Sequence, residues 1–82
     1  MARILVVEDQ KNLLRSLSRG LRESGFVPSV AETIESAKRV MSPEINSVVL
    51  DLMLPDGSGL DWLAALRAAG DRTPVLVLTA RN

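Results

Sequence analysis

Nearly unbroken apolar runs occupy residues 4–7, 47–50 and 75–78 of the chain. They are rich in Val and Ile and lack the alternation of apolar and polar positions that marks a half-exposed strand. Short runs of this kind are typical of strands that are buried on both faces, as in the middle of a parallel sheet. We therefore predict three buried strands at these positions.

The segments between these runs have apolar residues at helical spacing. A helix over about residues 10–24 would carry an apolar stripe made of Leu13, Leu14, Leu17 and Leu21. Thr33 is a candidate N-cap for a second helix, and Ser58 begins a capping-box pattern for a third, which would carry Leu60, Leu63, Ala64 and Leu66. Gly25 and Gly70 are placed to end the first and third helices.

A further strand is predicted at residues 26–31. Pro28 within it cannot donate a hydrogen bond to a neighbouring strand, so this strand should lie at a sheet edge. Strands and helices then alternate as β-α-β-α-β-α-β along residues 1–82, which we treat as one domain. This alternation predicts an α/β fold with a parallel sheet and right-handed crossovers.

Composition narrows the chemistry that is available to the chain. The 82 residues contain 10 Lys and Arg against 10 Asp and Glu, so no charge excess points to nucleic acid or to a membrane surface. The absence of Cys and His excludes disulfides, thiolate sites and the commonest zinc ligand, which leaves a hard cation bound by oxygen. The N-terminal apolar run is too short for a signal peptide or a membrane span, and we expect a cytoplasmic protein.

Acidic and hydroxyl side chains follow the predicted buried strands. Glu8 and Asp9 follow the strand at residues 4–7, Asp51 follows that at 47–50, and Thr79 follows that at 75–78. Because the carboxyl ends of parallel strands share one sheet edge, these side chains should converge there. Close carboxylates repel each other unless a cation compensates, and oxygen ligands in a wet site favour Mg²⁺. A carboxylate can also accept a phosphoryl group as an acyl phosphate.

A purely structural interpretation exists for each of these residues. A single Asp after a strand is most often a turn residue or a helix cap, and Glu8 and Asp9 could cap the helix that follows. Asp56, Gly57 and Ser58 are better explained as turn and cap, and Trp62 as packing. The coincidence of acids at separate strand ends favours a functional site.

Three segments carry a family resemblance: Ile4–Asp9, Val48–Leu60 and Thr73–Arg81. Each resembles, in order and spacing, a motif of the receiver domains of two-component response regulators. The Asp-Leu-Met-Leu-Pro segment that begins at Asp51 is similar to OmpR/PhoB-type transcription factors. The resemblance implies a flavodoxin-like parallel sheet of order 2-1-3-4 with flanking helices.

The resemblance also implies roles for individual residues. Asp51 would accept phosphate from a phosphohistidine of a sensor histidine kinase, and Thr79 would hydrogen-bond the phosphoryl group. Glu8, Asp9 and Asp51 would bind Mg²⁺ together with the backbone carbonyl of Met53. Such a domain is a signalling module and not a stand-alone enzyme. It would reach DNA only through an effector domain outside these residues, and no membrane partner is implied.

The family has five strand–helix units, and this sequence ends just after the fourth strand, so the fourth helix, the fifth strand with the family's lysine at its end, and the fifth helix are missing. We therefore expect a truncated receiver with impaired phosphorylation and with self-association through the open edge at residues 75–78. One alternative is an assembly fragment without phosphotransfer. Another is an aspartyl phosphatase of the haloacid-dehalogenase type, but that chemistry needs an acid where Met53 stands.

Overall fold

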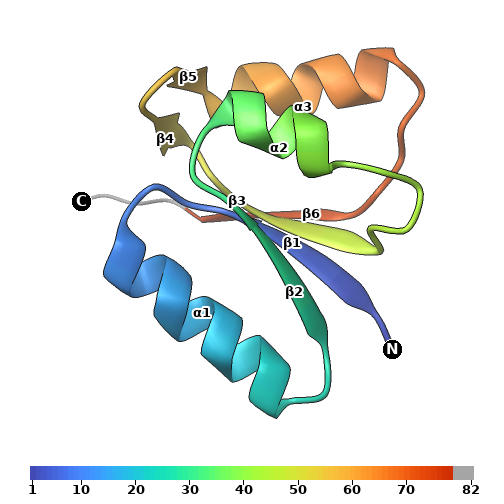
Figure 1. Cartoon of the computed structure of the whole chain (residues 1–82). Coiled ribbons are helices and arrows are strands. Elements are labelled where there is room, and N and C mark those ends of the chain that lie inside the picture. The colour runs from blue at the N-terminus through green and yellow to red at the C-terminus, as the bar shows by residue number, and fades with distance from the viewer. Residues whose placement is uncertain (79–82) are drawn as a thin grey trace.

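The computed structural model describes residues 1–78, which form a parallel four-stranded sheet of order β2-β1-β3-β6 (Figure 1). The strands are β1 (Arg3–Val7), β2 (Val27–Ala31), β3 (Ser47–Asp51) and β6 (Val75–Leu78). The predicted α/β class and the order 2-1-3-4 are confirmed, with β6 as the fourth strand of the sheet. Among residues 1–78, no helix is long and apolar enough to cross a membrane.

The central strand β1 and the edge strand β2 differ in burial and pairing, as the sequence predicted. Ile4, Leu5, Val6 and Val7 of the central strand β1 are all buried. β2 pairs only with β1 among the described residues, so Pro28 lies on an edge strand, where its missing N–H is tolerated.

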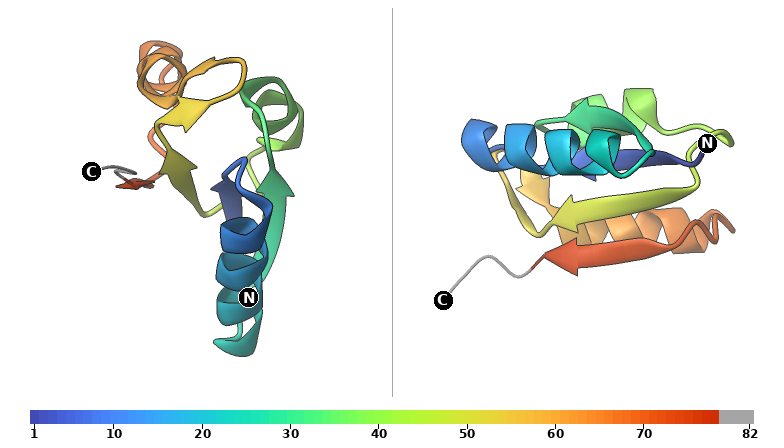
Figure 2. Two further views of the ribbon diagram at one scale, coloured as in Figure 1. Left: turned by 90° about the vertical axis from the view of Figure 1, so that its left-hand side faces the viewer. Right: turned by 90° about the horizontal axis from the view of Figure 1, so that it is seen from below.

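The helices cover the sheet unequally (Figures 1 and 2). Helix α1 (Lys11–Glu23) lies on one face, and α2 (Ile34–Val40) and α3 (Gly59–Ala68) lie on the other. The larger core forms on the two-helix side and contains Leu5, Val7, Ala31, Ala37, Ile45, Val48, Leu50, Leu54 and Trp62. The core beneath α1 has only Ile4, Val6 and Leu14 as buried residues among those described, so that side of the sheet is thinly covered.

The predicted stripe of α1 was wrong at one position. Leu13 is 42% exposed, and the buried residues of the helix are Leu14 and Ser18. Leu17 and Leu21 pack at the border of the small core. Positions 14, 18 and 21 share one helical face, and Leu13 lies beyond its edge. The buried Ser18 hydroxyl has no hydrogen-bond partner within residues 1–78.

Helix α3 also departs from its predicted stripe. Leu60 is 53% exposed and Ala64 is exposed, while Trp62 is only 4% exposed and joins the larger core. The interpretation of Trp62 as packing is confirmed. Ser58 is the N-cap, but its hydroxyl accepts a hydrogen bond from the N–H of Leu60 at 3.2 Å, so the expected capping box with Asp61 does not form.

The predicted turn after Asp51 is confirmed, and one strand prediction needs correction. Pro55 and Asp56 form the turn, which joins β4 (Met53–Leu54) and β5 (Gly57–Ser58) in a short antiparallel hairpin that was not predicted from the sequence. β6 is not buried on both faces, since Leu76 is 64% exposed. On the α1 side, no helix of the described chain extends over this strand (Figure 2, right).

Candidate metal centre

The carboxyl ends of the sheet strands bring the acids of β1 and β3 together. Val7 of β1 pairs with Leu50 of β3, so Glu8, one residue beyond β1, lies level with Asp51 at the end of β3. The backbone N–H of Glu8 donates to the carbonyl of Ala31 at 3.0 Å and continues the ladder with β2. The left view of Figure 2 looks onto this edge.

Three carboxylates meet at this edge. One oxygen from each of Glu8, Asp9 and Asp51 lies within 4.8 Å of the other two. This separation is comparable to the span of two oxygen–metal bonds of about 2.1–2.5 Å each. The three donors therefore fit around one hard divalent cation, directly or with water completing the shell.

Backbone N–H groups hold the two buried carboxylates. Glu8 is 3% exposed and Asp51 is 4% exposed, whereas Asp9 is exposed. The Glu8 carboxylate accepts a hydrogen bond from the N–H of Gln10 at 2.9 Å. Asp51 Oδ1 accepts a longer one from the N–H of Met53 at 3.4 Å. Each acid is thus oriented by the residue two positions after it, as in an Asx-type turn.

The electrostatics of the cluster favour a cation. Burial raises the pKa of the Glu8 carboxyl above its usual range, and the charges of Asp51 and Asp9 raise it further, although the hydrogen bond from Gln10 acts in the opposite direction. Within residues 1–78, the ion pairs are Lys11–Glu32 and Arg39–Glu35, so none of them compensates these acids. A divalent cation bound among the three carboxylates would offset their mutual repulsion.

Gly59 lets α3 approach the end of β3 closely. Its N–H donates to the carbonyl of Leu52 at 2.8 Å. A Cβ at this position would lie 2.5 Å from the carbonyl oxygen of Asp51 and 3.1 Å from the Cα of Leu52. Only glycine fits here without displacing the backbone that carries Asp51.

Other residues singled out in the sequence have mixed outcomes. The side chain of Met53 is 64% exposed, so only its backbone remains a candidate ligand. Thr79 lies outside the described residues, and its role stays a prediction. Sequence reasoning missed Gln10, whose side chain caps α1 by accepting from the N–H of Leu13. The sequence indicates a turn or cap residue at Asp56, and it does lie in a turn, but the helix that it caps is α2.

Residues 4–82 match the family model of the response regulator receiver domain. The chain belongs to this family. It is 44% identical over 79 residues to the probable transcriptional regulatory protein SilR of Salmonella typhimurium, covering 95% of this chain and 35% of SilR. It is 42% identical over 83 residues to the transcriptional regulatory protein PrrA of Mycobacterium tuberculosis, covering 98% and 35%. The receiver chain thus spans about a third of the length of these relatives.

Solved receiver structures superpose closely on the chain. The non-phosphorylated HemR receiver domain of Leptospira biflexa matches with a TM-score of 0.91 and 36% identity, covering 99% of this chain and 66% of that one. TrrA of Thermotoga maritima, solved in complex with Mg(2+)-BeF, matches with a TM-score of 0.88 and 34% identity, covering 100% and 72%.

Replacing Gly59 with Ala should lower the free energy of unfolding by about 1–3 kcal/mol, because the new Cβ would force backbone apart in a packed region. Urea denaturation followed by circular dichroism measures this. Gly20→Ala on α1 is the matched control, since a Cβ there meets nothing within 4 Å. It should be neutral or stabilising by up to about 1 kcal/mol. Equal stability of Gly59→Ala and the unmodified receiver would contradict the close approach.

Glu8→Gln should make the metal-free receiver more stable at neutral pH. A raised folded pKa means that the folded state keeps the Glu8 proton at pH values where the unfolded chain has lost it. The stability that this group contributes is therefore lost as the pH rises from the ordinary pKa of 4.5 through the raised pKa of the folded state. Gln does not ionise, so the variant avoids this loss. Its side-chain oxygen can still accept the hydrogen bond from the N–H of Gln10.

Urea titrations without divalent ions between about pH 4 and pH 8 would measure this dependence. The Glu8→Gln variant should show a shallower decline of stability with rising pH. Asp9→Asn, which removes an exposed acid of the same cluster, is the control and should change the profile less. An unchanged slope in Glu8→Gln would refute the electrostatic explanation.

Proposed function

We propose that this receiver domain takes a phosphoryl group on Asp51 from a sensor histidine kinase, with Mg²⁺ bound at the adjacent acids. The observation that carries the proposal is the meeting of Glu8, Asp9 and Asp51 within 4.8 Å at the carboxyl edge of the sheet. Membership of the receiver family supports it. So does the position of the acids, because ligands of open α/β sheets bind at this edge.

In the proposed transfer, a carboxylate oxygen of Asp51 attacks the phosphorus of a phosphohistidine. The new P–O bond forms as the P–N bond breaks, and the electron pair leaves with the imidazole, which takes up a proton. The product on Asp51 is an acyl phosphate. Burial of Asp51 beside Glu8 keeps bulk water from surrounding the carboxylate, and the N–H of Met53 orients it.

The carboxylates of Glu8, Asp9 and Asp51 and the backbone carbonyl of Met53 would hold Mg²⁺, Glu8 partly through water. When bound, the ion offsets negative charge between the carboxylates and the phosphoryl oxygens. Thr79 would hydrogen-bond the transferred group.

Relatives support the partners in this proposal. TrrA, 35% identical to this chain in that complex, has been solved together with the histidine kinase ThkA. Curated relatives such as SilR and PrrA are named as transcriptional regulatory proteins. We therefore propose a histidine kinase as the phosphoryl donor, and DNA as a target reached only through an effector domain outside these residues.

Incubation with acetyl phosphate and Mg²⁺ should add one phosphoryl group to the receiver, detected by intact-mass spectrometry. Asp51→Asn should remove the added mass because the nucleophile is lost, and a chelator should do the same. Asp61→Asn, which removes an exposed acid of α3, is the control and should be labelled normally. Equal labelling of Asp51→Asn, or labelling that ignores Mg²⁺, would exclude the proposal.

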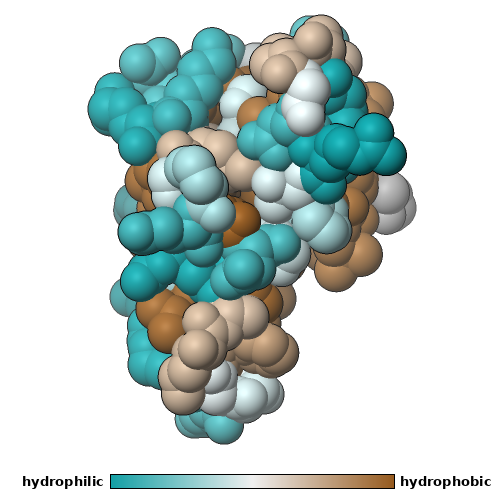
Figure 3. Space-filling model, turned by 90° about the vertical axis from the view of Figure 1, so that its right-hand side faces the viewer, coloured by the Kyte–Doolittle hydropathy of each residue, from teal (hydrophilic) through white to brown (hydrophobic). Residues whose placement is uncertain are grey.

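A second candidate function is self-association of the 82-residue chain. It is favoured by a shallow apolar groove between α1 and β6 whose walls include Leu21, Val49, Val75 and Leu76. The outer edge of β6 has no partner strand among residues 1–78, and an open apolar edge can pair with a second copy. On the face at the amino ends of the strands, hydrophobic residues are also visible between hydrophilic ones (Figure 3).

Sedimentation velocity of the 82-residue polypeptide over a range of concentrations tests this candidate. We expect a concentration-dependent dimer, and Leu76→Lys should weaken it because a charged residue would lie at the paired edge. Leu60→Lys, at an apolar residue similarly exposed on α3, is the matched control and should leave it intact. A compact monomer at all concentrations would rule out self-association.

A further inference from the structure

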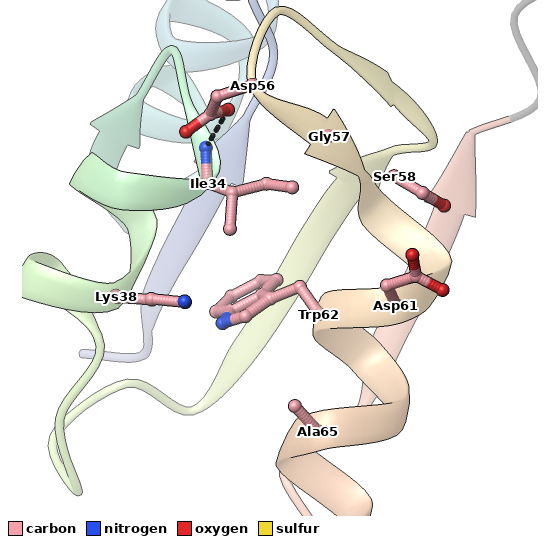
Figure 4. A pocket seen from close by; sticks show the side chains of 8 residues that line it. All are labelled: Ile34, Lys38, Asp56, Gly57, Ser58, Asp61, Trp62 and Ala65. Atoms are coloured by element: carbon pink, nitrogen blue, oxygen red, sulfur yellow. Dashed lines mark hydrogen bonds between the residues drawn. The ribbon is translucent and has the colours of Figure 1, made fainter.

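Asp56 joins two parts of the fold that are distant in sequence. It stands at the turn between β4 and β5, and its carboxylate accepts two hydrogen bonds from the first turn of α2, of which Figure 4 draws the one from Ile34. Oδ1 accepts from the N–H of Ile34 at 2.8 Å, and Oδ2 accepts from the N–H of Glu35 at 3.0 Å. These two N–H groups hold the pKa of the Asp56 carboxyl below its usual range.

The first turn of α2 leaves these two donors for Asp56. Its N-cap Thr33 forms a capping box with Ser36, and the hydroxyl of Thr33 accepts from the N–H of Ser36 at 3.0 Å. The N–H of Ala37 is bonded to the carbonyl of Thr33. The N–H groups of Ile34 and Glu35 would otherwise depend on water, so Asp56 completes the N-terminus of the helix from a separate segment.

The same turn is fastened to α2 by packing. Gly57 has φ of +152°, and a Cβ built on it would lie 3.1 Å from Cδ1 of Ile34. Figure 4 shows Ile34 directed from α2 toward this hairpin, beside Trp62 of α3. Close contact and two hydrogen bonds therefore fix the tip of the hairpin against α2.

The base of the hairpin is the end of β3. Met53 pairs with Ser58 across the hairpin, and its N–H lies 3.4 Å from Oδ1 of Asp51. Leu54, the next residue, is buried in the larger core. Two paired residues in each strand are a small ladder, so the hairpin depends on its anchors at both ends. Loss of the hydrogen bonds between Asp56 and α2 would therefore loosen the hairpin segment that carries Met53.

We infer that Asp56 is a positioning residue for the metal centre: its cap on α2 fixes the hairpin after Asp51 and so keeps the backbone of Met53 in place to bind Mg²⁺. The inference rests on the proposed function, because it concerns the same ion. Groups that orient metal ligands commonly change metal affinity by about tenfold or more when removed.

Titration of the receiver with Mg²⁺ alone, by isothermal calorimetry and without a phosphoryl donor, tests this role. Asp56→Ala should weaken Mg²⁺ binding by about tenfold. Asp56→Asn, which keeps one acceptor oxygen, should lie between it and the unmodified chain. Asp56 and Asp61 both line a groove between α2 and α3, drawn in Figure 4. Asp61→Asn therefore removes the same charge from the same part of the surface, and should change the affinity by no more than about twofold.

Each measurement is made below the unfolding transition of the variant, so a loss of stability alone does not change the affinity. Unchanged Mg²⁺ affinity in folded Asp56→Ala would overturn the inference and leave the proposed function standing. If Asp56→Ala does not fold, Asp56→Asn decides, and native affinity in that variant overturns the inference equally. Absence of Mg²⁺ binding by the unmodified receiver would refute the inference and the proposed function together.

Discussion

Repulsion among carboxylates at the ends of adjacent parallel strands is the constraint that shapes this site. The register of β1 and β3 places Glu8 level with Asp51, and Asp9 follows directly. Two of the three acids are buried, where an unpaired charge is costly. The fold tolerates them because backbone N–H groups orient the buried pair and because a hard cation could join all three. Local stability is thus reduced at the edge where we propose that the cation binds, and reduced stability is common at functional sites.

The rest of the fold positions this edge with uneven support. On the side of α2 and α3, the larger core includes Trp62 and residues of β1, β2 and β3, so the carboxyl ends of β1 and β3 rest on dense packing. Gly59 and the β4–β5 hairpin continue that support beyond Asp51. On the side of α1, the core is small and the groove beside β6 is open. The proposed metal centre therefore depends mainly on the better-packed half.

Much of this arrangement could be predicted from local signals. Apolar runs and helical spacing gave the order of the elements, Pro28 gave an edge strand, and parallel topology placed Glu8 and Asp51 at one edge. The details that failed depend on tertiary contacts. Periodicity alone could not choose between Leu13 and Ser18 for burial. The hydrogen bonds of Asp56 to α2 span more than twenty residues of sequence, and no local pattern marks them.

The most direct test of this account is a crystal structure of the receiver soaked with Mn²⁺, an oxygen-preferring stand-in for Mg²⁺ that scatters anomalously. The account predicts one strong anomalous peak enclosed by the carboxylates of Glu8, Asp9 and Asp51, with oxygen contacts of about 2.1–2.5 Å or through a bridging water. No peak at this edge at saturating Mn²⁺, or a peak bound elsewhere with the three acids empty, would contradict it.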